Sequence, residues 1–187
     1  MTGTSDSPNR RWAATHRRIF TTALDLFEDF GFEQVSVSRI AARAGVSVPT
    51  FYAHYASKEH LIMAPPTVEE VGALLATQPA GLQVGERVLQ ANLLWIARMD
   101  PDEYAELASR WRIIATTPVL RTRVAEYERG TAGMILANLT TPSDTTQIVQ
   151  ASAALAATTA ALLAWADGNG ERKLEELFDE AFRALSA

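Results

Sequence analysis

The chain has 187 residues, a net charge of −5 and no cysteine. The length allows one domain or two small ones, and the lack of cysteine excludes disulfides, thiolate metal sites and cysteine nucleophiles. Charge is unevenly distributed, because residues 1–60 carry 7 basic and 6 acidic side chains, which leaves 10 basic and 16 acidic ones for residues 61–187. This balance argues against indiscriminate coating of nucleic acid and fits a phosphate-facing amino-terminal end.

The amino-terminal segment is predicted to be a polar tail followed by a helix. Residues 1–9 lack the apolar core of a signal peptide, so we expect a disordered tail and a cytoplasmic protein. Apolar side chains then recur at helical spacing from Ile19 to Phe30, and Gly31 supplies the permissive backbone expected just past a helix end. A first helix is therefore predicted over roughly 10–30. Four arginines lie near its start, of which the last two are expected to contact phosphates: Arg10, Arg11, Arg17 and Arg18.

Residues 36–55 have the pattern of a helix-turn-helix. Ser36 is placed to cap a short helix that ends at Gly45, and Ser47 is placed to cap the next one. Pro49 is tolerated in the first turn of that second helix, where its missing N–H costs nothing. In a helix-turn-helix the second helix lies in the DNA major groove. The spacing leaves five side chains of this helix free to face outward: Val48, Pro49, Thr50, Tyr52 and His54.

The segment from Ser36 to Glu59 resembles the DNA-binding segment of the TetR family of repressors, and the resemblance extends over residues 15–62. It implies an all-α homodimer whose three amino-terminal helices bind an operator half-site and whose larger helical domain binds a small inducer. Arg39 and Val48 are the candidates for reading base edges, whereas the Thr50 and Tyr52 hydroxyls and the Lys58 ammonium are expected to donate to phosphates. The implied DNA contacts are Ser36, Arg39, Ser47, Val48, Pro49, Thr50, Tyr52, His54 and Lys58.

Two features depart from the family's pattern. Arg39 takes the third position of its helix, where an acidic residue usually completes a capping box, so the helix loses stability and gains positive charge. Pro65 and Pro66 interrupt the fourth helix, which in many relatives continues toward the ligand domain. We therefore predict a DNA-binding domain over 10–63 and a ligand-binding and dimerisation domain over 64–187.

The rest of the chain is predicted to be helical, which makes the fold class all-α. Helical patterns run roughly over 67–77, 83–99, 101–116, 118–138, 143–167 and 171–185. The stretch Thr145–Ala166 has 22 uncharged residues, close to the roughly 20 that a bilayer-spanning helix needs. Few of these residues are strongly apolar, and Asp144 and Asp167 flank the stretch in place of Lys or Arg. A buried helix is therefore expected, and no membrane span.

The carboxy-terminal domain is expected to hold an apolar pocket with a few polar groups. Arg98, Arg110 and Arg112 are candidates to bind an anionic head group, although aromatic stripes at helical spacing are more often core. This half of the chain also resembles regulators that sense acyl-thioesters, among them the mycofactocin-system regulator group, which implies an acyl-CoA-like or other hydrophobic inducer. The candidate ligand-binding residues are Trp95, Met99, Tyr104, Trp111, Arg112 and Tyr127.

The last two helices are predicted to form a dimer interface. The helix over 143–167 has apolar or small side chains on two faces and the helix over 171–185 is amphipathic, so the pair would form a four-helix interface with its symmetry mates. The alternative is that both helices belong to the intramolecular core. A dimer is favoured because two half-sites about 34–36 Å apart require two recognition helices. The candidate dimer residues are Ser152, Leu155, Ala156, Thr159, Leu163, Leu177, Phe178 and Phe182.

These patterns together predict a DNA-binding transcriptional regulator, and in the first instance a repressor that leaves a palindromic operator when a small hydrophobic ligand binds. An activator and a helical adaptor that binds only protein are the alternatives. An enzyme is disfavoured because no serine stands in a Gly-x-Ser-x-Gly setting and every histidine lies in the amino-terminal third. No cofactor or metal is expected, since His54 and His60 are too far apart along the helices to share one face.

Overall fold

The computed structural model describes residues 8–63, 65–139 and 144–185. Across these ranges the chain forms helices, turns and loops but no strand, so the predicted all-α class is confirmed. The chain divides into two compact units, Met1–Ala64 and Pro65–Ala187, and the division falls at two consecutive prolines. Each unit has its own set of buried apolar side chains.

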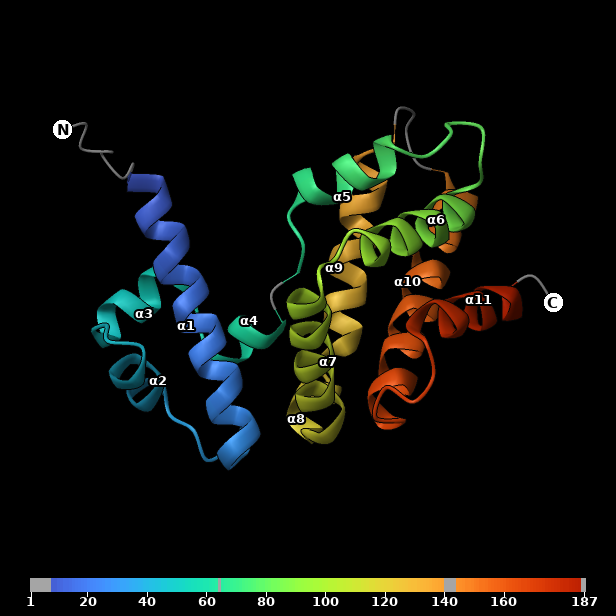
Figure 1. Ribbon diagram of the computed structural model, residues 1–187. Coiled ribbons are helices and arrows are strands. Elements are labelled where there is room, and N and C mark those ends of the chain that lie inside the picture. The colour runs from blue at the N-terminus through green and yellow to red at the C-terminus, as the bar shows by residue number, and fades with distance from the viewer. Residues whose placement is uncertain (1–7, 64, 140–143, 186–187) are drawn as a thin grey trace. The chain divides into compact units, whose positions relative to one another are not determined.

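The first unit is built on one long helix and three short ones (Figure 1). They are α1 (Pro8–Phe30), α2 (Val37–Arg43), α3 (Val48–His54) and α4 (Lys58–Met63). α1 buries Ile19, Ala23 and Phe27, which lie four residues apart on one helical face. The short helices contribute buried side chains of their own: Ile40 from α2, Phe51 from α3, and Leu61 and Ile62 from α4. This core fixes the angle between α2 and α3.

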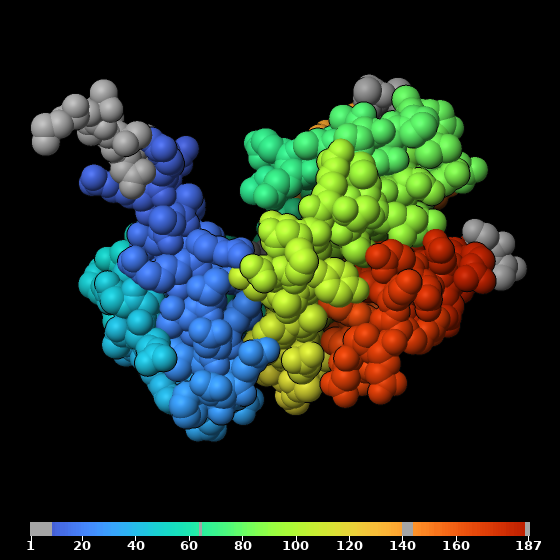
Figure 2. Space-filling view, in the orientation of Figure 1, coloured from blue at the N-terminus to red at the C-terminus, as the bar shows by residue number. Residues whose placement is uncertain are grey.

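The second unit has one central helix, against which other helices of the unit pack (Figure 1). Its helices are α5 (Val68–Ala76), α6 (Val84–Ala97), α7 (Pro101–Thr116), α8 (Pro118–Arg121), α9 (Val124–Ala137), α10 (Thr145–Asp167) and α11 (Leu174–Ala184). α10 contacts α6, α7, α9 and α11. In the space-filling view α6, α7 and α11 form one continuous surface of this unit (Figure 2).

The predicted single helix over 118–138 is wrong in one respect, because a turn at Thr122 and Arg123 separates α8 from α9. The side chain of Arg121 holds α8 in place. Its guanidinium donates to the Ala115 carbonyl at 3.1 Å and forms a two-point ion pair with Asp167 at 3.2 and 3.1 Å. The end of α7, α8 and the end of α10 are thereby joined.

Within the described part of the chain, α10 is the helix that has the length and apolar composition to cross a membrane. Half of that apolar window is buried inside the protein. Ala151, Ala154 and Thr159 are almost completely buried, and α10 is in contact with four other helices of its unit. Its apolar character is therefore explained by a central position in a helical core.

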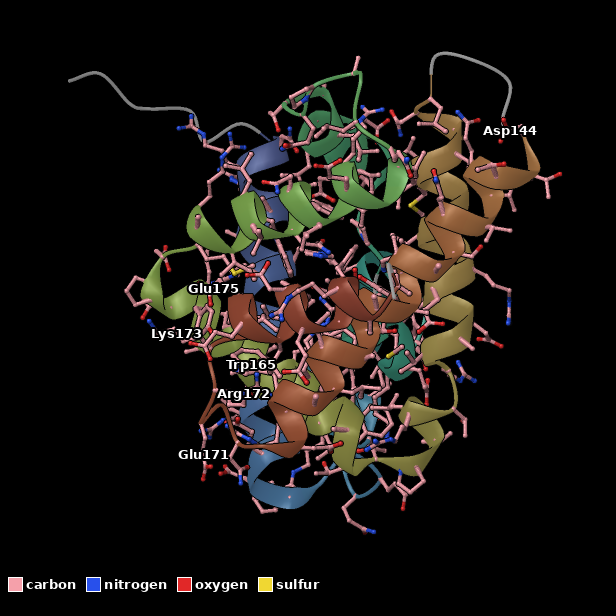
Figure 3. All side chains as sticks on the ribbon, turned by 90° about the vertical axis from the view of Figure 1, so that its right-hand side faces the viewer. Asp144, Trp165, Glu171, Arg172, Lys173 and Glu175 are labelled. Carbon is pink, nitrogen blue, oxygen red and sulfur yellow. The ribbon has the colours of Figure 1, made fainter. Side chains whose placement is uncertain are left out.

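The turn after α10 returns the chain so that α11 packs on α10. Gly170 has φ of +73°, and a Cβ at this position would approach Nε1 of Trp165 to 3.6 Å. The Trp165 ring also meets Tyr104 of α7 edge-on, with ring centroids 5.1 Å apart. Figure 3 shows Trp165 beside this turn, and Asp144 at the opposite end of α10, where its side chain caps the helix by accepting from the Gln147 N–H at 2.8 Å.

Candidate nucleic-acid interface

Side-chain caps set the starts of α2 and α3. The Ser36 hydroxyl accepts a hydrogen bond from the Arg39 N–H at 3.2 Å, and the Ser47 hydroxyl accepts one from the Thr50 N–H at 3.1 Å. Each cap satisfies a backbone donor that the first turn of a helix leaves without an intrahelical acceptor. Both helices therefore begin where the sequence predicts.

A tight turn joins α2 to α3. Gly45 has φ of +66°, a backbone conformation that costs other residues about 1–2 kcal/mol. The next N–H, of Val46, donates to the Ala41 carbonyl at 2.9 Å and closes the end of α2. Because Ala41 and Phe51 are both buried, the two helices are held on one core while the front of α3 faces away from it. This is the arrangement of a helix-turn-helix.

The front of α3 is open to solvent. Tyr52 is 53% exposed and Pro49 is exposed, while Val48 and Thr50 are half-buried. The Thr50 hydroxyl lies 2.8 Å from the Ser47 hydroxyl, and either oxygen is able to donate in that pair. A small, largely uncharged front with two hydroxyl groups allows close approach to a DNA groove and hydrogen bonds to phosphates.

Exposed arginines are present on α1 and α2 of the same unit. Arg39 is exposed, and its guanidinium carbon lies 3.7 Å from the centre of the Phe30 ring, so the charge stacks on the end of α1. Ser36 is exposed beside it on the loop that enters α2. Arg17 and Arg18 lie on the exposed side of α1.

His54 corrects one expectation, because its ring does not face freely outward. It lies in a ring cluster with Trp12 and His16 of α1 and with Tyr55, which immediately follows α3. Ring centroids in this cluster are 4.8 Å apart for Trp12 and His54, 4.7 Å for Trp12 and His16, and 4.2 Å for His16 and Tyr55. The Tyr55 hydroxyl donates to the His16 carbonyl at 3.1 Å. The cluster fastens the end of α3 to α1.

The surroundings of His16 in this cluster favour its uncharged imidazole. Nδ1 of His16 and Nδ1 of His54 are buried and have no hydrogen-bond partner among the described residues. Burial lowers the pKa of His16, and the charges that His54 and His60 carry when protonated lower it further. No group of three or more His, Asp or Glu within the described ranges is arranged to hold a metal ion.

Lys58 also differs from expectation. Its ammonium does not extend from the surface toward a phosphate but donates to the Phe32 and Val35 carbonyls at 2.7 and 3.0 Å. The nitrogen lies 4.2 Å from the centre of the Phe32 ring. Sequence reasoning missed this arrangement because the acceptors are backbone atoms of a loop more than twenty residues away, which no local pattern marks.

The predicted ligand residues do not form one group. Trp111 is buried and meets Tyr127 edge-on at 6.4 Å between ring centroids, while Trp95, Met99 and Tyr104 are half-buried. Burial raises the pKa of Tyr127 and, likewise, the pKa of Tyr104. Arg112 is exposed on α7 and lies outside this interior.

Sequence reasoning missed a polar layer inside the second unit. The Asn92 amide donates to the Thr158 hydroxyl at 2.8 Å, and the Thr159 hydroxyl donates to the Glu128 carboxylate. These contacts join α6 and α9 to the central α10. The signal available in the sequence was the threonine pair Thr158 and Thr159 within the apolar second half of α10.

The predicted dimer residues divide into two groups. Several of them pack inside the second unit and are unavailable to a partner, which corrects their assignment in favour of the intramolecular alternative: Leu155, Thr159, Leu177, Phe178 and Phe182. Ser152 and Ala156 are exposed, and Leu163 is half-buried. Burial of one face of α11 in its own unit explains the amphipathic pattern without a second chain.

Two family models match the chain. Residues 19–64, which include all of α2, α3 and α4, match the model described as bacterial regulatory proteins of the tetR family. Residues 82–187, more than half of the chain, match the model described as the MftR C-terminal domain. The chain belongs to the TetR family. Members of this family are regulatory proteins, so the alternative of an enzyme is dismissed.

Curated relatives of this TetR-family protein match it over part of their length. A protein described as a mycofactocin biosynthesis transcriptional regulator, MftR of Mycobacterium tuberculosis, is 32% identical over 114 residues, which are 60% of this chain and 57% of MftR. The transcriptional regulator TcmR of Streptomyces glaucescens is 36% identical over 84 residues, 44% of this chain and 35% of TcmR. The chain therefore aligns with about half or less of these relatives.

Solved structures share the fold of this TetR-family protein. NalD, the secondary repressor of the MexAB-OprM multidrug efflux pump in Pseudomonas aeruginosa, has a TM-score of 0.55 with 20% identity over 92% of this chain and 96% of NalD. FadR from Bacillus subtilis, solved in complex with stearoyl-CoA, has a TM-score of 0.53 with 18% identity over 91% of this chain and 97% of FadR. At these identities the likeness concerns the fold.

Proposed function

We propose that this protein is a cytoplasmic, homodimeric repressor that leaves a palindromic operator when a small hydrophobic ligand binds its second unit. The observation that carries the proposal is the front of α3, where Pro49 and Tyr52 are exposed on a helix that Ser47 caps. Such a front fits the major groove, and family membership supports DNA as the partner. Base reading falls to Arg39 and Val48, and phosphate contacts to Thr50, Tyr52, Arg17 and Arg18.

The dimer surface in this proposal is one face of α10. Val149 is 60% exposed, and Ser152, Ala156 and Ala160 follow it at intervals of three or four residues and are exposed as well. Residues at this spacing share a helical face. Small side chains allow a second copy of α10 to approach closely, and an isologous contact across a two-fold axis matches the symmetry of a palindromic operator.

The ligand in this proposal is apolar over most of its length. Trp95, Tyr104 and Tyr127 are half-buried aromatic side chains that each offer apolar surface, and Glu128 and Asn92 add polar groups inside the same unit. FadR, which has a similar fold, was solved with stearoyl-CoA. Acyl-CoAs of graded chain length are therefore the first compounds to test.

DNA binding is tested by selection from random duplex DNA with the purified protein. An enriched palindrome is expected with the unaltered protein and none with the double variant Arg39→Ala, Tyr52→Ala, because both side chains are exposed at the proposed interface. The matched control is Val119→Ala, Arg129→Ala, which changes exposed residues of the second unit and is expected to recover the same sequence. No enrichment with the unaltered protein would favour an adaptor that binds only protein.

Ligand release is tested on the selected duplex. Fluorescence anisotropy of the labelled duplex, titrated with acyl-CoAs of increasing chain length, is expected to fall for the long chains and to remain unchanged with free CoA. Binding of every acyl-CoA without release of DNA would leave a DNA-binding regulator but remove ligand-controlled repression. A fall in reporter expression on ligand addition would instead indicate activation.

A further inference from the structure

Lys58 begins α4, and its ammonium is held by the loop between α1 and α2. The half-buried nitrogen donates to the Phe32 carbonyl at 2.7 Å and the Val35 carbonyl at 3.0 Å. It also lies 4.2 Å from the centre of the buried Phe32 ring. Three separate interactions, two charge-assisted hydrogen bonds and one cation–π contact, therefore fix one side chain.

Reaching a phosphate would require this ammonium to leave its acceptors. An ammonium has three donors, and two of them are already used on carbonyls within the protein. Leaving these carbonyls without their charged donor would cost more free energy than a solvent-exposed contact with a phosphate would contribute. The side chain is therefore better suited to shaping the first unit than to touching DNA.

The loop that Lys58 holds leads directly into the helix-turn-helix. Val35 precedes Ser36, whose hydroxyl caps α2 through the Arg39 N–H. Gly31, at the other end of the loop, has φ of +80°. Lys58 therefore ties the first turn of α4 to the residue before the α2 cap, and α2 in turn packs on α3.

We propose that Lys58 is a positioning residue for operator binding: it holds the entry to α2 from the start of α4 and does not itself contact a phosphate. The inference rests on the proposed DNA-binding function. Its consequence is that α4, which already contributes Leu61 and Ile62 to the core, also bears on the entry to α2 through this one side chain. A displacement of the start of α4 would therefore also move the loop that leads into α2.

Salt dependence separates the two roles of a lysine. A phosphate contact releases counterions, so its loss lowers the slope of log affinity against log salt by about 0.9 for each contact removed. A positioning residue lowers the fraction of protein competent to bind and leaves that slope unchanged, so Lys58→Met is expected to weaken binding to the selected palindrome about tenfold at every salt concentration. Arg18→Gln, an exposed arginine expected at phosphate, is the control and should reduce the slope.

A second variant guards against simple misfolding. Phe32→Leu removes the ring beneath the ammonium without removing any cationic group, and Phe32 is buried, so it has no access to DNA. Phe32→Leu is expected to weaken operator binding and to leave the salt slope unchanged. In a protein that already carries Lys58→Met, adding Phe32→Leu should lower operator affinity by a smaller factor than it does in the unaltered protein. A reduced slope in Lys58→Met together with an unaffected Phe32→Leu would overturn the inference.

The unaltered protein gives an independent readout. NMR spectra of the unaltered protein should show one lysine ammonium signal whose hydrogens exchange slowly with water, and this signal should be absent in Lys58→Met. Its hydrogen exchange rate and chemical shift should stay the same when the duplex is added. Loss of that signal on DNA binding would overturn the inference by showing that the ammonium leaves the loop. If the unaltered protein selects no DNA, the proposed function fails, and wild type and variants are then equally inactive.

Discussion

At the scale of single residues, the His16 imidazole makes the stability of the first unit sensitive to acid. Its pKa is lowered from 6.5 in the folded chain, by burial and then by His54 and His60. The unfolded chain therefore binds more protons than the folded chain below about pH 6.5. The stabilising contribution of neutral His16 is complete above that pH, and is lost progressively as the pH falls toward the folded-state value.

The urea midpoint of unfolding, measured between pH 7.5 and pH 5, tests this prediction. The midpoint is expected to fall with pH in the unaltered protein and to fall less steeply in His16→Gln, which has no proton to bind in this range. Trp12 stacks on His16, so its fluorescence reports the same transition. A midpoint that rises on acidification, or an identical pH profile in the variant, would contradict the prediction.

The interface residues show which features of a side chain can be predicted from the sequence and which cannot. Ser36 and Ser47 were predictable as caps because the donor that each one satisfies lies three residues away. The orientations of His54 and Lys58 were not predictable, since their partners lie on α1 and on the loop that follows it. The sequence around a side chain that packs against a distant segment looks the same as the sequence around a side chain that faces solvent.

At the scale of elements, the turn between α2 and α3 depends on glycine for its conformation and not for space. A Cβ at Gly45 would meet nothing within 4 Å, but φ is +66°. Gly45→Ala is therefore expected to lower the free energy of unfolding by about 1–2 kcal/mol. Gly130 in α9 also has open space but ordinary helical backbone, so Gly130→Ala is expected to raise it by about 0.5–1 kcal/mol.

Urea denaturation of both glycine variants, followed by circular dichroism, measures these opposite effects. Operator affinity adds a second readout, because a strained turn also shifts the angle between α2 and α3. Equal stabilities for the two alanine variants would show that the left-handed backbone at Gly45 is not a constraint.

The exposed face of α10 gives a prediction for the assembly. Ala156→Glu is expected to convert a dimer into a monomer, because it places a charge in the middle of an apolar strip that a second copy would bury. Sedimentation velocity measures the change. The matched control is Ala125→Glu on the exposed side of α9, which should leave the dimer intact; dissociation of both variants, or of neither, would place the dimer interface elsewhere.

The spacing of apolar residues predicted the helices of the second unit but not what each helix packs against. Leu177, Phe178 and Phe182 repeat on one face of α11, and this pattern is the same whether the face meets its own unit or a second chain. The structure buries them in the unit itself. The turn between α8 and α9 was not predicted either, and the ion pair that holds α8 joins Arg121 to Asp167, 46 residues further along the chain.

At the scale of the whole molecule, the proposed repressor has its two sites in different units. The proposal assigns DNA binding to the first unit, Met1–Ala64, and ligand binding to the second, Pro65–Ala187. A ligand that never touches the DNA-binding helices acts only through its different affinity for two conformations of the dimer. To shift those conformations from 1:99 to 99:1, the ligand must discriminate by about 5.5 kcal/mol, which is within the reach of a buried apolar chain.

This separation of sites predicts a limit to the effect of the ligand. If ligand and operator bind different units, operator affinity falls to a plateau as the ligand becomes saturating, and the operator weakens ligand binding by the same factor. If the ligand instead occupies the DNA-binding surface, operator affinity falls without limit as ligand concentration rises. Operator titrations at a series of fixed acyl-CoA concentrations, and acyl-CoA titrations with and without the selected duplex, measure both factors. The absence of a plateau would place the ligand on the first unit, because direct competition excludes a complex that holds both. Equality of the two factors is required by linkage and checks that both titrations reached equilibrium.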